Sequence, residues 1–198
     1  MLKNLIQEFI NIEIKFIVLI QYLFNGPEEN LLLIKLGKFF TNNHLHNEII
    51  KYTVIYDCFR KYYYGMTIFS IIQFLFFNII KIHLVLYISK SINYTIKHTF
   101  KIPRPYLKES NIQKITIKKD KSKSYSFPSN SIQNSYVFYW NIFNTLHPDS
   151  LIGFWIINFI ILLLAFIKTL RGLHYLHDII PGLIIANLIV YPIKYYSL

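Results

Sequence analysis

The run from Leu151 to Ile167, LIGFWIINFIILLLAFI, contains no charged side chain. An α-helix needs about 20 predominantly apolar residues to cross the hydrocarbon core of a bilayer. Lipid offers no water to the backbone N–H and C=O groups, and a helix satisfies these groups internally. The run therefore predicts a membrane-spanning helix, and this strongly limits what the rest of the chain can be.

Further apolar runs follow the same logic. Two of them are strong: Met66 to about Ile88, which Lys81 and His83 interrupt, and Ile179–Ile193. Three are weaker: Ile12–Phe24, Leu45–Cys58 and Ser131–Leu146, of which Ser131–Leu146 is semi-polar and aromatic. Because 54% of the residues are hydrophobic and only 16% are charged, we predict an all-α membrane protein. We expect one domain over residues 1–198, with about six transmembrane helices in a bundle. The alternative, a soluble all-helical bundle, would need a more polar surface.

The formal net charge of +11 would suggest a nucleic-acid partner in a soluble protein. No basic helix with a polar face, zinc pattern or RNA-binding motif accompanies it, so no nucleic-acid partner is expected. The charge is better explained by juxtamembrane positions or by anion binding. The single cysteine, Cys58, excludes an internal disulfide and a cysteine metal cluster. Glu8 and Glu13 interrupt the N-terminal apolar run, which favours an amphipathic or anchoring helix over a signal peptide.

The long polar segment from Lys97 to Ser126 carries nine Lys or Arg residues. Phe127–Asn130 follows it and has the Pro and Ser of a helix start. If Ser131–Leu146 and Leu151–Ile167 form a hairpin across the membrane, the basic segment and the segment Lys168–Asp178 emerge on the same side. Two cationic segments with histidines would then face each other.

Three clusters in these segments predict a phosphate site. Lys97, Arg104 and Lys168 supply positive charge to non-bridging oxygens, and the helix start near Ser129 and Asn130 directs backbone N–H groups at an anion. A further pair, His174 and Asp178, supplies a nucleophile and the carboxylate that orients it. No cluster of Asp and Glu indicates magnesium, so we expect no metal and no cofactor.

The clusters Lys97-x6-Arg104-Pro105, Pro128-Ser129-x-Ser131 and Lys168-x5-His174-x3-Asp178 resemble the three motifs of the type 2 phosphatidic acid phosphatase superfamily, over about Leu45–Leu198. The resemblance implies its core six-helix plan, a lipid phosphate substrate and phosphate-binding roles for Lys97 and Arg104. Ile102–Tyr106 and Tyr125–Ser129 are similar to the sphingosine-1-phosphate phosphatase branch. That branch implies a role in sphingolipid metabolism in the endoplasmic reticulum membrane.

Two positions depart from the family motifs. Ser131 stands where family members carry the histidine that is implied to protonate the leaving alkoxide. A hydroxyl is a poor proton donor near neutral pH, and loss of general acid–base help costs about 10²–10⁴ in rate. Lys168 stands where Arg is expected, which keeps the charge but loses the planar fork.

A rival register pairs Arg171 with His177, but it places Pro181 at the Asp position. The first register keeps Asp178 and is preferred. His177 lies next to the site in sequence, which motivates the hypothesis that it replaces the missing acid.

The leading interpretation is a metal-independent lipid phosphate phosphatase that forms a phosphohistidine on His174, with Ser131 in the place of the usual acid. The first alternative is a catalytically inactive family member that binds lipid phosphates or membrane partners. The second alternative is a channel or transporter, which is supported only by the pattern of several predicted membrane spans. The orientation of the site stays open: the basic segment favours the cytosol, and the resemblance implies the lumen.

Overall fold

A computed structural model describes residues 2–24, 27–112, 125–146 and 150–196. Every regular element in these ranges is a helix, as the sequence predicts. The elements are α1 (Leu2–Leu23), α2 (Pro27–Phe40), α3 (Asn43–Tyr63), α4 (Ile68–Phe100), α5 (Pro105–Lys108), α6 (Asn130–Leu146), α7 (Leu151–Leu170) and α8 (Leu176–Tyr196). Two parts of the sequence prediction, residues 113–124 of the basic segment and the turn at 147–149, lie outside the described residues.

Side-chain caps explain where several helices begin. The hydroxyl of Thr67 accepts from the backbone N–H of Ser70 at the start of α4, and the hydroxyl of Ser150 accepts from that of Gly153 at the start of α7. Each cap satisfies one backbone N–H that has no partner inside the helix. At the other end of α4, Lys101 adopts a left-handed conformation with φ of 51°, which turns the chain away from the helix axis.

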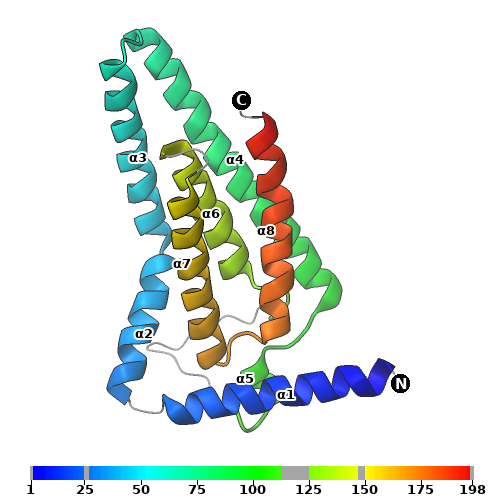
Figure 1. Ribbon diagram of the computed structural model, residues 1–198. Coiled ribbons are helices and arrows are strands. Elements are labelled where there is room, and N and C mark those ends of the chain that lie inside the picture. The colour runs from blue at the N-terminus through cyan, green and yellow to red at the C-terminus, as the bar shows by residue number, and fades with distance from the viewer. Residues whose placement is uncertain (1, 25–26, 113–124, 147–149, 197–198) are drawn as a thin grey trace.

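The long helices run side by side along the bundle, and α1 lies across one end of it, near α5 (Figure 1). The chain leaves α4 and enters α6 at this end, and it leaves α7 and enters α8 there as well. The segment between α4 and α6 and the segment between α7 and α8 are therefore brought together, as the predicted hairpin of α6 and α7 requires.

Within the described residues, three stretches are long and apolar enough to cross a membrane: Ile68–Lys108, Leu151–Leu170 and Leu176–Ile193, the last of which forms most of α8. Large apolar side chains such as Phe76, Phe77 and Phe159 are exposed on the outside of these helices. Exposed apolar area of this extent fits a lipid solvent rather than water. The other three predicted spans also lie in helices, namely α1, α3 and α6, but the count of six spans stays a prediction.

The helix α6 lies in the centre of the bundle, where it packs against α3, α4, α7 and α8. Its residues Ile132, Val137 and Phe138 are fully buried. This position explains the semi-polar composition of α6, because other helices shield it from lipid and polar side chains can find partners there.

A buried amide network joins α4 to α6. The amide of Asn93 donates to Gln133 Oε1 at 2.7 Å, and Gln133 Nε2 donates to the carbonyl oxygen of Ser89 at 2.8 Å. The hydroxyl of Ser89 in turn donates to Asn134 Oδ1 at 2.7 Å. Interhelical hydrogen bonds of this kind hold membrane helices together, since lipid supplies little hydrophobic drive for helix association.

Replacing the central amide should loosen this joint. We expect Gln133→Leu to destabilise the protein by about 1–3 kcal/mol, because it strips partners from buried polar groups on α4. The measurement is unfolding of the detergent-solubilised protein by heat. The matched control is Asn158→Leu, since the amide of Asn158 donates to Phe154 one turn earlier on its own helix. Equal melting temperatures for the two variants would contradict a stabilising role of the network.

Candidate active site

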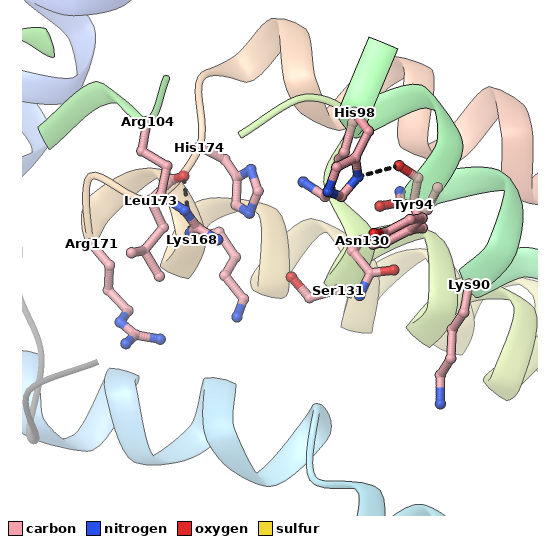
Figure 2. A pocket seen from close by; sticks show the side chains of 12 residues that line it. Lys90, Tyr94, His98, Arg104, Asn130, Ser131, Lys168, Arg171, Leu173 and His174 are labelled. Carbon is pink, nitrogen blue, oxygen red and sulfur yellow. Dashed lines mark hydrogen bonds between the residues drawn. The ribbon is translucent and has the colours of Figure 1, made fainter. Parts of the chain in front are cut away.

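A cavity of about 540 Å³ opens where α4, α6 and α7 meet at the end of the bundle. It contains side chains from all three predicted clusters (Figure 2). Its lining residues are Lys90, Asn93, Tyr94, Lys97, His98, Arg104, Asn130, Ser131, Lys168, Arg171, Leu173 and His174. Six of the eight predicted site residues line it, whereas Ser129 and Asp178 are absent from this lining.

Five cationic side chains line this cavity, namely Lys90, Lys97, Arg104, Lys168 and Arg171, and its described lining contains no carboxylate. Lys97, at the end of α4, is buried and donates from Nζ to the carbonyl oxygens of Tyr125 at 2.7 Å and Ser126 at 3.1 Å. Arg104 is buried as well, and its Nη1 lies 3.5 Å from the carbonyl oxygen of Leu173. The concentration of positive charge in a partly buried space favours an anionic ligand.

The turn after α7 sets the spacing between Lys168 and His174. Gly172 has φ of 62°, a conformation that glycine adopts without steric cost. The N–H of Gly172 donates to the carbonyl oxygen of Thr169 at 2.9 Å, and that of Leu173 donates to Lys168 at 3.1 Å. These two bonds form a Schellman motif, which ends a helix and reverses the chain. As a result, Lys168 on the last turn of α7 and His174 beyond it line the same cavity.

His174 is buried and its Nδ1 lies 3.5 Å from Asp178 Oδ2. This distance is too long for a well-formed hydrogen bond, and Nδ1 has no other partner among the described residues. Burial lowers the pKa of His174 to about 4, with the Asp178 carboxylate opposing the shift and Arg104 and Lys97 adding to it. The imidazole is therefore neutral near pH 7. With Nδ1 directed at Asp178, Nε2 is the nitrogen available for chemistry in the cavity.

Asp178 is fully buried in the first turn of α8. Its Oδ2 accepts from the backbone N–H of Tyr175 at 2.8 Å, and its Oδ1 lies 3.5 Å from the hydroxyl of Ser126. The bond to Tyr175 caps α8, and a negative charge at a helix N-terminus is stabilised by the helix dipole. Asp178 is thus held by its own helix start, which fixes where it meets His174.

The start of α6 is attached to the start of α8. The backbone N–H of Ser129 donates to the carbonyl oxygen of Asp178 at 3.0 Å, and a Cβ on Gly182 would meet the carbonyl oxygen of Ser129 at 3.1 Å. This close approach explains a glycine at position 182. It also means that the N–H of Ser129 is already engaged, so of the two predicted helix-start residues only Asn130 stands at the cavity wall.

Ser131, one residue into α6, lines this cavity and a second one of about 740 Å³ between α3, α4 and α6. The two cavities share Lys90, Asn130 and Ser131. The second cavity has polar walls that include His46, Asn47 and Asn134. Ser131 therefore stands where the two cavities adjoin.

The structure separates the two candidate histidines. His174 lines the cavity, whereas His177 is absent from its lining. Instead, His177 Nδ1 lies 2.5 Å from Glu13 Oε2 on α1. Of these two histidines, His174 therefore lies at the cavity and His177 contacts α1, while the register and the role of each stay predictions. Arg171, from the rival register, nevertheless lines the same cavity as Lys168.

Sequence reasoning missed one face of α4. Lys90, Asn93, Tyr94 and His98 line the cavity beside the predicted Lys97, and the spacing of these five residues is that of a single helix face. This polar stripe on an otherwise apolar helix was a detectable signal. It adds a second imidazole to the site, because His98 lies across the cavity from His174 in Figure 2.

No group of three His, Cys, Asp or Glu side chains that could hold a metal ion is found in the described part of the chain. The side chains that line the cavity can bind an anion through their positive charges, attack an electrophile through a neutral imidazole and transfer a proton through a second imidazole.

The sequence profile of the PAP2 superfamily matches residues 78–198, which is more than half of the chain. A crystal structure described as the first transmembrane PAP2 type phosphatidylglycerolphosphate phosphatase, from Bacillus subtilis, is similar with a TM-score of 0.49 and 14% sequence identity. The similarity covers 93% of this chain and 94% of that chain. A comparison with curated proteins finds no match.

The lowered pKa of His174 predicts a loss of stability in acid. Between a pKa of about 6.5 for an unfolded histidine and about 4 in the folded state, the unfolded chain binds more protons, so folding stability falls as the pH falls. We expect wild type to lose more stability than His174→Gln between about pH 7 and about pH 4.5, since Gln does not titrate. The measurement is the thermal midpoint of both proteins against pH. Parallel curves would contradict a buried neutral imidazole at position 174.

Proposed function

The chain belongs to the PAP2 superfamily, and on that premise we propose that it hydrolyses a lipid phosphate monoester through a phosphohistidine on His174. The observation that carries this proposal is the cavity itself, where five cationic side chains surround a neutral, buried imidazole that faces a carboxylate. The family membership and the apolar outer surface favour a lipid substrate in a bilayer. The proposed class is therefore a metal-independent phosphoric monoester hydrolase.

In this mechanism Lys97, Arg104 and Lys168 hold the non-bridging oxygens of the phosphate. The bonds from Lys97 and Arg104 to backbone carbonyls position both groups before substrate arrives, which lowers the entropic cost of binding the transition state. Arg171 and Lys90 add charge to the same cavity. Asn130, at the start of α6, brings the positive end of a helix to the anion.

The nucleophile is His174 Nε2. Its lone pair attacks phosphorus, a P–N bond forms, and the bond from phosphorus to the ester oxygen breaks with its electron pair on the alkoxide. Asp178 stabilises the positive charge that develops on the ring, because its carboxylate lies 3.5 Å from Nδ1. Water then attacks the phosphohistidine and passes one proton to the residue that protonated the alkoxide. The P–N bond breaks with its electron pair on Nε2, and inorganic phosphate leaves with His174 restored to its neutral form.

The alkoxide that leaves needs a proton. Ser131 can donate a hydrogen bond to it but is a poor acid near neutral pH. We assign the proton to His98, whose Nδ1 donates to the carbonyl oxygen of Tyr94 at 2.8 Å. Since a carbonyl oxygen only accepts, Nδ1 carries a hydrogen and Nε2 is the atom that gains and loses the proton. The ring packs on Tyr94 with centroids 3.9 Å apart, which restricts its orientation.

The substrate class within lipid phosphates is the finer part of the proposal. The segments Ile102–Tyr106 and Tyr125–Ser129 resemble the sphingosine-1-phosphate phosphatase branch, so we propose a long-chain base phosphate first and a phosphatidate second. The polar second cavity beside Ser131 is suited to the hydroxyl or amino groups near the phosphate of such lipids. With that substrate, the endoplasmic reticulum membrane is the proposed location.

A second candidate function rests on Ser131. A family member without the usual histidine at this position would bind lipid phosphates through the same cations and release no phosphate. The proposed acid His98 distinguishes the two functions, because an active enzyme requires a proton donor and a lipid-binding protein does not.

We expect the detergent-solubilised protein to release phosphate from sphingosine-1-phosphate or phosphatidate in excess EDTA. His174→Ala should abolish release, because the variant lacks the nitrogen that forms the bond to phosphorus. The measurement is inorganic phosphate against time. No phosphate release by wild type, together with release by Ser131→His, would favour the inactive lipid-binding protein. No phosphate release by either protein, with both shown to be folded, would contradict the phosphatase proposal.

The role of His98 predicts a dependence on the leaving group. His98→Ala should lower hydrolysis of an alkyl lipid phosphate by about 10²–10⁴ but should spare 4-nitrophenyl phosphate, whose leaving group is stable without a proton. The matched control is His44→Ala, since His44 is an exposed histidine near the start of α3 that lines neither of the two cavities. Equal losses on both substrates would contradict an acid role for His98.

A further inference from the structure

The helix α1 presents three different faces. One face is buried against the rest of the protein and contains Glu13, Ile17, Ile20 and Gln21. The second is exposed and polar, with Gln7, Asn11 and Lys15 four residues apart. The third is exposed and apolar. A helix in water ordinarily exposes polar side chains and buries its apolar ones, so the exposed apolar face requires an explanation.

The apolar face is a regular stripe. Its members are Phe9, Ile12, Phe16, Leu19 and Leu23, which repeat at intervals of three and four residues. Their side chains are 43–64% exposed. An apolar stripe beside a polar one on the same helix is typical of a helix that lies in the plane of a membrane interface.

The contacts of the buried face give the depth of α1. Gln21 Nε2 donates to the carbonyl oxygen of Leu170 at 2.9 Å, and Leu170 is the last residue of a helix that is long and apolar enough to cross a membrane. Directly after α1, the ring of Phe24 packs edge-on against Phe166, which lies on α7 like Leu170, with centroids 5.3 Å apart. The helix α1 is therefore attached where α7 ends, at the level where hydrocarbon gives way to the interface.

The orientation of α1 agrees with this depth. It lies across the end of the bundle, at a steep angle to α7 and α8 (Figure 1). Because α7 and α8 cross the membrane, a helix across their ends runs roughly along the membrane plane.

We propose that α1 is a membrane-interface helix, rather than the span predicted for Ile12–Phe24. It is seated on a lipid surface through the stripe Phe9–Leu23, and its Glu13 positions the first turn of α8. The occupant of the stripe is the bilayer in which the protein resides. The stripe lies outside the segment that matches the PAP2 superfamily, residues 78–198, so it is a feature of this chain beyond the family match.

Glu13 connects α1 to the candidate active site. Its carboxylate is buried and accepts from the backbone N–H of His177 at 2.9 Å, with His177 Nδ1 2.5 Å from its second oxygen. On the far side of the ring, His177 Nε2 lies 3.7 Å from Asp178 Oδ1. Asp178 in turn faces His174. Glu13 is therefore a positioning residue that acts through His177 on the carboxylate behind the nucleophile.

The membrane part of the proposal is tested without any activity. In a Cys58→Ser background, the full chain is labelled with an environment-sensitive fluorophore after Ile12→Cys or Leu19→Cys on the stripe. The matched controls are Asn11→Cys and Lys15→Cys on the polar face. The proteins are reconstituted in phosphatidylcholine vesicles and exposed to nitroxide-bearing lipid and, separately, to aqueous iodide.

Lipid nitroxide should quench the stripe labels more than the control labels, and iodide should do the reverse. Iodide quenching of the stripe labels equal to that of the controls would overturn the proposal, since the stripe would then face water. Efficient cross-linking of Ile12→Cys between two copies, with protection from both quenchers, would overturn it in favour of a dimer contact.

The positioning role of Glu13 rests on the proposed phosphatase activity, and it is tested separately through kcat and KM. Glu13→Ala should lower kcat by roughly tenfold or more with KM nearly unchanged, because the nucleophile's partner is displaced and the phosphate-binding cations are not. Glu13→Gln, which keeps an acceptor for the N–H of His177, should recover part of the loss. The matched control is Glu8→Ala, an exposed carboxylate on the same helix.

Hydrogen exchange separates failure of this part from failure of the proposed function. If wild type releases no phosphate, the backbone amide of His177 should still exchange faster in Glu13→Ala than in Glu8→Ala. Unchanged exchange, or a rise in KM without a fall in kcat, would overturn the positioning role of Glu13.

Discussion

The arrangement of the site depends on one buried carboxylate. Asp178 has no exposed surface, and an ionised carboxylate removed from water is costly unless it is paired and hydrogen-bonded. Here the N–H of Tyr175 donates to the carboxylate at 2.8 Å. The hydroxyl of Ser126 and the rings of His174 and His177 surround it at 3.5–3.7 Å. Ser126 lies in a different part of the chain from the other partners, so satisfying this one group aligns the start of α8, the segment before α6 and His174, the proposed nucleophile.

The positively charged side chains of the cavity are also costly to bring together, because they repel one another. Five positive side chains share about 540 Å³, where like charges repel more strongly than in water. Backbone carbonyls that accept from Lys97 and Arg104 compensate part of this cost, and a phosphate would compensate much more. A site built in this way has a higher energy when empty than when occupied by an anion. The same arrangement therefore favours an anionic ligand, for which a phosphate is the proposed candidate.

The distribution of polar and apolar groups follows from the lipid solvent. Large apolar side chains on α4, α7 and α8 are exposed, whereas Gln133, Asn93 and Ser89 are buried between helices. In water this arrangement would be unfavourable on both counts. In a bilayer the exposed apolar groups contact lipid and the buried amides supply directional contacts between helices. The rigid joint between α4 and α6 then holds Lys97 and His98 at a set distance from the start of α6.

Local patterns in the sequence predict the helical membrane class, the hairpin of α6 and α7 and the meeting of two cationic segments. The apolar run Leu151–Ile167 and the spacing from Lys168 to Asp178 have consequences that follow from short stretches of backbone alone. Only the tertiary structure decided which side chains share the cavity. The packing of α4 against α6 selects the face that carries His98, and Glu13 meets His177 from 164 positions away with no signal near either residue. Contacts between distant elements depend on how the whole bundle packs, and that packing assembled the site.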